Sequence, residues 1–384
     1  MTDATVNRAP HAAGPAQDDA RPLVHIENAC KYYKIDAKKT LKAVDGVTLD
    51  IMPGEAVGLV GESGCGKSTL GKIVSRIEPV TAGTVSFDGK TVNADAAGKR
   101  RDVLSQEERK QFCKAVQVVF QDPYSSLNPR QQIGKALERA LAAQNLYPKS
   151  RDKRVDELLE MVDLPLDSKG RYPHEFSGGQ RQRVCIARAL AVEPRFLICD
   201  EPISALDVSI QAQIVNLLVD MKQRFGLTML FISHDLSVVK YICDRVVVMY
   251  LGRIVETAPS EELYGNPFHY YTRALLSAIL EADPDAQAQS NRIILEGDIP
   301  TPVNPAPGCA LAGRCPFADD MCTRIRPELT DIGNGHSVAC HHIDKVASAF
   351  RKTKGVRKSQ DESSALAISE GGAASDARKE EPSC

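Results

Sequence analysis

The sequence lacks any apolar run that approaches the roughly 18 residues needed to cross a bilayer, so we expect no segment to span a membrane. Residues 1–19 lack the basic start and the apolar stretch of a secretory signal. We therefore expect the protein to stay in the cytosol, where it can still dock on a membrane protein.

The chain also lacks a charge imbalance, because 48 Lys and Arg residues are matched by 50 Asp and Glu residues, for a net charge of −2. No overall field of one sign attracts nucleic acid or an anionic membrane, so the prediction is no nucleic-acid partner. Hydrophobic residues make up 43% and charged residues 26%, which is typical of globular proteins. The length of 384 residues allows one large domain and a smaller one.

Between residues 22 and 258, short apolar segments alternate with helical patterns. This alternation predicts an α/β fold with a mostly parallel sheet covered by helices, and it includes a mainly helical part over about residues 127–185. Proline and cysteine become frequent after residue 258, which indicates a second, small domain over 259–345. Residues 1–21 and 346–384 have the composition of disordered tails. There is no internal repeat.

Residues 61–69 match the phosphate-loop pattern G-x-x-x-x-G-K-[ST] between an expected strand and an expected helix. The residues are Gly61, Glu62, Ser63, Gly64, Cys65, Gly66, Lys67, Ser68 and Thr69. The glycines let backbone N–H groups turn toward phosphate oxygens, and the N-terminus of the helix adds positive partial charge. We expect Lys67 to reach the β- and γ-phosphates and the Ser68 hydroxyl to ligate Mg²⁺.

Cys65 lies inside this loop and allows two interpretations. Lys67 and the helix terminus could lower the pKa of its thiol, in which case alkylation would block ATP binding. The simpler interpretation is that a small residue fits there.

The apolar segment at 196–199 ends in Asp200 and Glu201. A strand here would deliver Asp200 beside the Mg²⁺ site and place Glu201 where it can orient or deprotonate the attacking water. The plain alternative is a solvated strand end.

Other motifs complete the pattern, although each has an ordinary explanation by itself. Gln121 ends another apolar segment, Phe176-Ser177-Gly178-Gly179-Gln180 could be a Ser-capped helix start, and His234 in Ser233-His234-Asp235 could be structural. In their order along residues 22–257, together with the Ser204–Asp207 loop, they resemble the ATP-binding cassette (ABC) ATPases. Phe176 stands where that family more often has Leu.

The resemblance implies an ABC-type fold, with a RecA-like core, an antiparallel β subdomain and a helical signature subdomain. It also implies that Tyr33 stacks on the adenine, with Tyr32 as the other candidate. Gln121 joins Ser68 and Asp200 at Mg²⁺, and His234 contacts the γ-phosphate and acts with Glu201 in catalysis. Residues Ser177, Gly178, Gly179 and Gln180, with Asp207 in the D-loop, would then act across a dimer on the ATP of a partner subunit.

The C-terminal part resembles one branch of this family. Residues 264–276, 297–300 and 307–316, together with 124–129, are similar to the ATPases of peptide, opine and nickel importers, and most similar to the second ATPase of dipeptide and oligopeptide importers. The implied partners are a second ABC ATPase, two transmembrane permeases and, indirectly, a solute-binding protein, at the cytoplasmic face of the inner membrane. Peptides are the favoured transported solute, and nickel, opines and glutathione are the alternatives.

A non-transport ABC ATPase is the alternative from another class. DNA-repair members would need long coiled-coil insertions, and translation factors carry a pair of cassettes in one chain. Neither feature is present in this sequence, so an importer subunit is favoured.

The sequence contains eleven cysteines. Those at positions 30, 65, 113, 185, 199, 243 and 384 are scattered and are expected to be reduced thiols, mostly in the core. The others, Cys309, Cys315, Cys322 and Cys340, form the spacing C-x5-C-x6-C-x17-C, which matches no common ferredoxin run or zinc knuckle. Four such thiolates could bind a [4Fe–4S] cluster or Zn²⁺, or they could be structural thiols or disulfides. The resemblance favours the cluster, and His341 or His342 could substitute for a cysteine in a zinc site.

Overall fold

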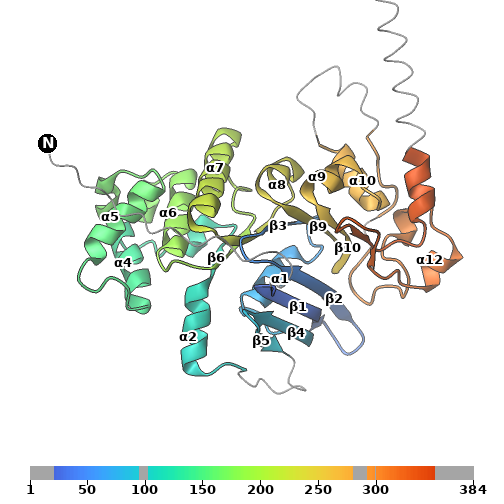
Figure 1. The fold of residues 1–384 in the computed structure, drawn as a ribbon, viewed down its shortest axis with the longest axis horizontal. Helices are drawn as coiled ribbons and strands as arrows, with labels where there is room; N and C mark the ends of the chain where they lie inside the picture. The colour runs from blue at the N-terminus through green and yellow to red at the C-terminus, as the bar shows by residue number, and fades with distance from the viewer. Residues whose placement is uncertain (1–20, 95–102, 280–291, 299, 351–384) are drawn as a thin grey trace, which may run out of the picture.

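A computed structural model describes residues 21–94, 103–279, 292–298 and 300–350 (Figure 1). The tails predicted for residues 1–20 and 351–384 lie outside the described residues. Residues 346–350, which the sequence also assigns to a tail, are described, and Val346 and Ala347 are buried.

The centre of the molecule is an eight-stranded sheet of order β11-β12-β10-β9-β3-β8-β7-β6. The strands from β9 to β6 are mutually parallel, as predicted. Their bounds are β3 (Ala56–Val60), β6 (Val116–Val119), β7 (Phe196–Asp200), β8 (Thr228–Ile232) and β9 (Arg245–Tyr250). Every residue of β3, β7 and β8 is buried, which explains why these strands are almost entirely apolar apart from Thr228 and Asp200.

Helices cover this sheet on both faces. They include α1 (Lys67–Val74), α2 (Gln106–Ala115), α7 (Val208–Phe225) and α8 (Leu236–Ile242). Beside it lies a second, antiparallel sheet of order β2-β1-β4-β5. Its strands are β1 (Val24–Lys34), β2 (Thr40–Ile51), β4 (Ala82–Phe87) and β5 (Lys90–Ala94). This sheet is the antiparallel β subdomain that the family resemblance implies.

The helical part lies at the far end from the C-terminal region (Figure 1). It contains α3 (Pro123–Ser126), α4 (Ile133–Ala143), α5 (Arg151–Met161), the short 3₁₀ turns η1 (Leu166–Gly170) and η2 (Pro173–Glu175), and α6 (Gly178–Leu190). Apolar residues of this part are fully buried in the core: Leu137, Leu141, Leu158, Leu159 and Val162.

The C-terminal region extends the main sheet, whereas the sequence predicts a separate small domain. Its elements are β10 (Arg253–Pro259), α9 (Ser260–Gly265), α10 (Tyr270–Ser277), η3 (Ala312–Arg314), α12 (Asp320–Arg324), β11 (Thr330–Asp331) and β12 (Ser337–Val338). Strand β12 pairs with β10, and β10 pairs with β9. The C-terminal region and the rest of the chain therefore share one sheet.

A buried carboxylate holds this junction together. Glu256 in β10 is fully buried and accepts hydrogen bonds from the backbone N–H groups of Phe268 and His269. His336 Nε2 lies 2.8 Å from the same carboxylate. Loss of any of these hydrogen bonds would leave a buried carboxylate with a missing partner, which is energetically costly. Glu256 therefore ties α10 and the β11–β12 turn to the sheet.

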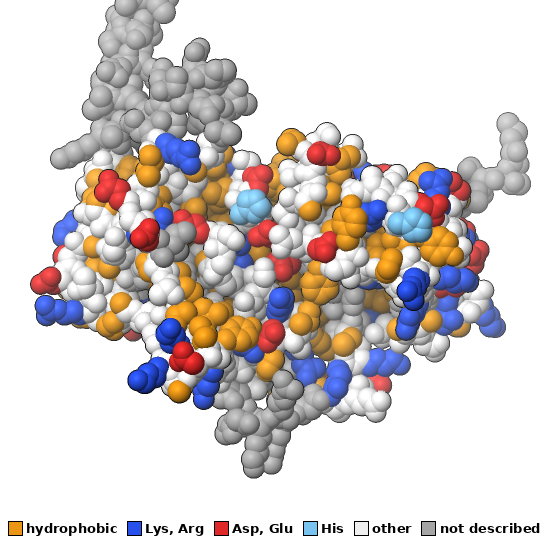
Figure 2. All heavy atoms as spheres, turned by 180° about the vertical axis from the view of Figure 1, so that it is seen from behind, with side chains coloured by type: hydrophobic (Ala, Val, Ile, Leu, Met, Phe, Trp, Pro, Cys, Tyr) orange, Lys and Arg blue, Asp and Glu red, His pale blue; other side chains and the backbone are white. Residues whose placement is uncertain are grey.

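No helix in the described part of the chain has the length and apolarity that a membrane span requires. Figure 2 shows side chains of both charge signs spread over one face of the molecule, as the small net charge predicts.

Candidate ATP-binding and hydrolysis site

The phosphate loop joins β3 to α1, as the sequence predicts, and at two of its glycines no side chain fits. Gly66 has φ of 106°, and a Cβ atom there would lie 2.1 Å from the carbonyl oxygen of Ala43. At Gly61 an added Cβ would lie 2.1 Å from the carbonyl oxygen of Met249. The neighbouring strands therefore approach the loop so closely that only glycine is possible at these positions.

Lys67 begins α1 and is buried, with its ammonium group turned onto the loop. Its Nζ lies 2.7 Å from the carbonyl oxygen of Gly61 and 3.0 Å from that of Glu62. These neutral acceptors hold the charge in the concave loop, where it is available to an anionic phosphate.

Cys65 fills space beneath this loop. Its side chain is buried, and burial raises the pKa of the thiol despite the nearby Lys67. The burial of Cys65 favours the interpretation as a small residue that fits the loop over the interpretation as an acidic, reactive thiol.

Asp200 ends β7 directly beside the start of α1. Its carboxylate accepts a hydrogen bond from the Ser68 hydroxyl at 2.8 Å. Burial raises the pKa of Asp200, and the Ser68 hydrogen bond partly opposes that shift. A hydroxyl and a partly desolvated carboxylate in contact suit Mg²⁺, so the structure brings together two of the three predicted ligands, Ser68 and Asp200.

Gln121 and His234 converge on Glu201, although they follow different strands. Gln121 Nε2 donates to the Glu201 carboxylate at 3.1 Å, and His234 Nδ1 lies 3.6 Å from the same oxygen. Glu201 has φ of 46°, a left-handed conformation that is uncommon for a side chain of this size. Three polar groups thus meet at the carboxyl ends of β6, β7 and β8, where parallel sheets bind ligands.

Tyr32 and Tyr33 on β1 differ in their contacts. The Tyr32 hydroxyl donates to Asp45 at 2.5 Å, and burial is the main cause that raises the pKa of Tyr32. Tyr33 has no such anchor to Asp45, and its ring lies 5.0 Å from Lys31 Nζ. The Tyr33 hydroxyl is therefore not held by Asp45 as that of Tyr32 is, and the adenine-stacking role of Tyr33 stays a prediction.

The signature segment caps a helix of the helical subdomain. Ser177 is the N-cap of α6 and forms a reciprocal capping box with Gln180. Gly179 packs against α7, where a Cβ atom would lie 2.3 Å from Ile210. Asp207, at the N-cap of α7, is exposed. Ser177 is also exposed, so both residues are accessible to another molecule.

Two family models match the chain. One describes ABC transporters and covers residues 44–204. The other describes the oligopeptide/dipeptide transporter C-terminal region and covers residues 255–322. A Brucella ovis protein named as a candidate peptide import ATP-binding protein is 54% identical over 83% of this chain and 97% of its own length. The chain belongs to the ABC transporter family.

Further relatives agree with this assignment. The oligopeptide transport ATP-binding protein OppF of Salmonella typhimurium is 48% identical, over 80% of this chain and 90% of its own. Among solved structures, the dimeric ATP-binding cassette MJ0796, bound to ADP and Pi, has a TM-score of 0.55 and 29% identity. It covers 62% of this chain and 98% of its own. The ABC fold and the ATP-binding role are thereby established for this chain.

The structure also brings residues to this ABC site that the motifs do not include. The Tyr271 hydroxyl accepts a hydrogen bond from the Glu62 backbone N–H at 2.7 Å, and Arg314 pairs with the Glu62 carboxylate at 3.1 Å. Both lie in stretches that the sequence marks as typical of peptide importers. Nothing in their spacing, however, indicates contact with a loop more than 200 residues earlier.

The four C-terminal cysteines line one pocket, together with Tyr270 and Phe317. Burial raises the pKa values of Cys309, Cys315 and Cys340, while backbone N–H groups directed at the sulfurs oppose those shifts. The net effect favours the protonated thiol at each of these cysteines.

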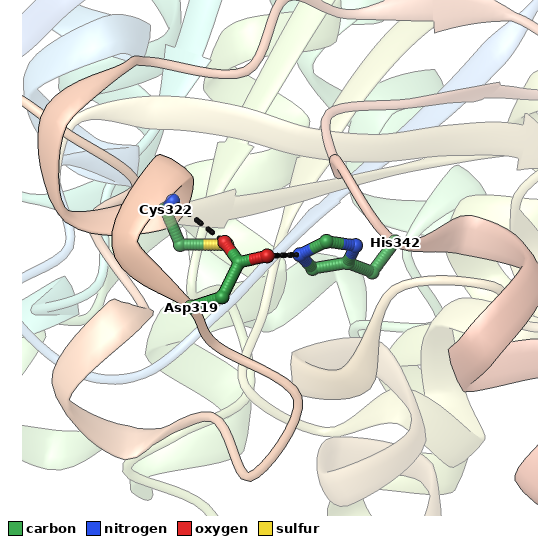
Figure 3. A group of neighbouring side chains, drawn as sticks. All are labelled: Asp319, Cys322 and His342. Carbon is green, nitrogen blue, oxygen red and sulfur yellow. Dashed lines mark hydrogen bonds and ion pairs between the residues drawn. The ribbon is translucent and has the colours of Figure 1, made fainter.

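Within the described ranges, one group of at least three potential metal ligands lies inside 4.8 Å: Asp319, Cys322 and His342. Figure 3 shows that His342 points at the Asp319 carboxylate, which lies 2.8 Å from His342 Nε2 and also caps α12 beside Cys322. His341 instead contacts the carbonyl oxygen of Ile325. Of the two histidines, only His342 could join a cysteine in a zinc site.

Proposed function

We propose that this chain is the ATP-hydrolysing subunit of an importer of dipeptides or oligopeptides. The observation that carries the proposal is the convergence of Gln121, His234 and Glu201 beside the phosphate loop, in a chain whose C-terminal region matches that of peptide transporters. Relatives named for peptide import share about half of its residues over most of their length, which supports the same solute class.

Each residue of the ATP site has a proposed role in binding or hydrolysis. Loop N–H groups and Lys67 hold the phosphates, while Ser68 and Asp200, with Gln121, would hold Mg²⁺, which neutralises phosphate charge when bound. Glu201 lies where a carboxylate can accept a proton from the attacking water, and His234 orients that water and contacts the γ-phosphate. Tyr33 stacks on the adenine.

Hydrolysis would require a second cassette, because the signature residues serve the ATP of a partner. Ser177 and Asp207 are exposed, and the similar cassette MJ0796 is described as a dimer. We propose a heterodimer with a second ABC ATPase, docked on two permeases at the cytoplasmic face of the membrane and supplied by a solute-binding protein.

Reconstitution with the partner subunits in proteoliposomes tests the function. The expected result is ATP-dependent uptake of a labelled dipeptide or oligopeptide, which is lost with Lys67→Ala. Uptake of nickel, an opine or glutathione in place of peptide would overturn the solute assignment. Recovery of this chain only as a homodimer without permeases would overturn the proposed partners.

We also propose that Cys309, Cys315, Cys322 and Cys340 hold a [4Fe–4S] cluster. They line a common pocket, yet they form no group within 4.8 Å among the described residues. The shared pocket and the resemblance to peptide-importer ATPases support the cluster. The group would crosslink segments that are distant in sequence.

The second candidate, Zn²⁺, is favoured by the Asp319–Cys322–His342 group. Analysis of anaerobically purified protein for iron, sulfide and zinc distinguishes the two. We expect the wild-type protein to contain nearly equal amounts of iron and sulfide. Cys340→Ser should lose both, and the exposed control Cys113→Ser should keep them. Zinc without iron would overturn the cluster.

A further inference from the structure

Glu62, the second residue of the phosphate loop, is held by groups that belong to none of the ABC nucleotide motifs. Its backbone N–H donates to the Tyr271 hydroxyl at 2.7 Å, and its carboxylate lies 3.1 Å from Arg314 Nη1. Arg314 Nη1 also lies 3.4 Å from the Tyr250 hydroxyl. Tyr271 and Arg314 come from the C-terminal region, whose helix α10 lies near β9 in Figure 1.

These contacts are protected from water. Tyr271 is 0% exposed, and the Arg314 side chain is 8% exposed. The rings of Tyr250 and Tyr271 pack against each other with centroids 4.6 Å apart. Because a buried donor or acceptor that loses its partner pays a desolvation cost, the contacts fix Glu62 more firmly than surface interactions would.

Glu62 in turn sets the position of the phosphate-binding lysine. Its carbonyl oxygen accepts from Lys67 Nζ at 3.0 Å and from the Cys65 backbone N–H at 3.3 Å. A shift of Glu62 would therefore move both the charge and the N–H groups that face the phosphates. We propose that the C-terminal region positions the phosphate loop through Tyr271 and Arg314, which makes the region part of the machinery that sets ATP affinity.

The cysteine pocket is lined by residues that are next in sequence to Tyr271 and Arg314. Tyr270 and Cys315 line that pocket, and they are the sequence neighbours of Tyr271 and Arg314. Disruption of the cysteine site should therefore loosen the phosphate loop. This step rests on the proposed metal at the four cysteines, whereas the positioning role of Tyr271 and Arg314 does not.

The first experiment measures the dissociation constant of ATP for the full chain carrying Tyr271→Phe or Arg314→Met, by titration with a fluorescent ATP analogue. Each variant should bind ATP about fivefold to tenfold more weakly, since each loses one buried or charge-assisted hydrogen bond. In the assembled transporter, KM for ATP should rise similarly while kcat stays within about twofold.

Matched controls separate positioning from stability. Tyr264→Phe removes a tyrosine hydroxyl that donates to the carbonyl oxygen of Leu236, and Arg324→Met removes an exposed arginine; neither contacts Glu62. Both should keep wild-type ATP affinity. Arg314→Lys should recover most of what Arg314→Met loses. Unchanged ATP affinity in Tyr271→Phe and Arg314→Met, even with a lowered melting temperature, would overturn the proposal.

The second experiment tests the cysteine step with Cys340→Ser, which lies far in sequence from both contacts. It should weaken ATP binding in the wild-type background and have no further effect in the Tyr271→Phe/Arg314→Met double variant. Equal effects in both backgrounds would overturn this step. Absence of any metal from wild-type protein would refute the metal site, while the first experiment would still decide the positioning role.

Discussion

Glu201 is the residue at which the local geometry departs most clearly from ordinary strand structure. Its φ of 46° turns the chain directly after β7, and its carboxylate meets Gln121 and His234. Left-handed conformations at non-glycine residues persist where the surroundings enforce them, often at functional sites. The geometry thus agrees with the assignment of Glu201 as the general base.

Glu201→Gln should lower ATP turnover by roughly 100-fold or more, because the amide cannot accept the proton of the attacking water. ATP binding should be retained, since the phosphate-binding groups are untouched. Turnover by the assembled transporter and ATP titration of the isolated chain measure these effects. Glu261→Gln, at an exposed residue of α9, is the control. A variant that kept more than about a tenth of wild-type turnover would refute the assignment of the base.

Cys65 should react slowly with thiol reagents, since burial both blocks access and raises the pKa of its thiol. The exposed Cys113 supplies an internal comparison in the same chain. Mass spectrometry after brief alkylation should find Cys113 modified well before Cys65. If Cys65 were modified as quickly as Cys113, the phosphate loop would have to open readily in solution.

At the scale of elements, the sequence predicts best where burial is uniform. Strands β3, β7 and β8 are buried at every position, and a strand buried on both faces leaves a nearly continuous apolar run, such as the one at residues 196–199. Strands β11 and β12 have two residues each and give no such pattern. Their pairing with the main sheet depends on contacts such as Glu256 with His336, which are 80 residues apart in sequence.

The candidate site follows the same rule. Ser68, Asp200, Gln121 and Glu201 could be predicted because each lies at a strand end or in a loop with a recognisable spacing, and parallel strands bring those ends together. Tyr271 could not be placed at the phosphate loop, because its position depends on how α10 packs on β9 and β10. A tyrosine in an apolar helix pattern is indistinguishable from an ordinary core residue.

Helix α10 contains a pH-sensitive element at its N-cap. His269 is buried, accepts a hydrogen bond from the Tyr271 backbone N–H, and burial lowers its pKa from 6.5 to about 4. In the unfolded chain the imidazole of His269 therefore binds a proton below pH 6.5, whereas in the folded chain it binds one only below about pH 4. Stability from this residue is present above pH 6.5 and is lost as pH falls toward 4, by up to about 3 kcal/mol.

His269→Asn keeps a side-chain acceptor at the N-cap but cannot titrate. Denaturant unfolding of both proteins at a series of pH values should show the free energy of unfolding falling more steeply for the wild type as pH drops below 6.5. Carboxylates titrate in both proteins, so the difference isolates His269. Parallel curves would mean that the folded protein accommodates the charged imidazole.

For the whole molecule, the shared sheet joins nucleotide binding to the C-terminal region. Strand β12 continues the sheet through β10 and β9 to β3, and β3 leads directly into the phosphate loop. Asn304 also bonds with the backbone of Thr40 and Lys38, which ties the extension to the antiparallel sheet. Motion of the extension therefore has a direct route to the ATP site.

The signature segment is proposed to serve the ATP of a partner, and in this chain the side chains of Ser177 and Gln180 each accept a hydrogen bond from the backbone N–H of the other residue. Ser177→Arg should leave ATP affinity of the isolated chain unchanged while turnover of the assembled complex falls at least tenfold. Loss of the cap costs only about 1 kcal/mol, so the chain should still fold. Lys67→Ala should instead lose ATP binding in the isolated chain.

The contrast between these variants locates the signature in the assembly. If Ser177 served its own phosphate loop, Ser177→Arg would weaken ATP binding in the isolated chain as Lys67→Ala does. If it serves a partner, the defect must appear only when a second ATPase is present, because only then is a composite site formed. Titration of each variant alone and in complex with its partner ATPase therefore decides whether two chains build one catalytic site.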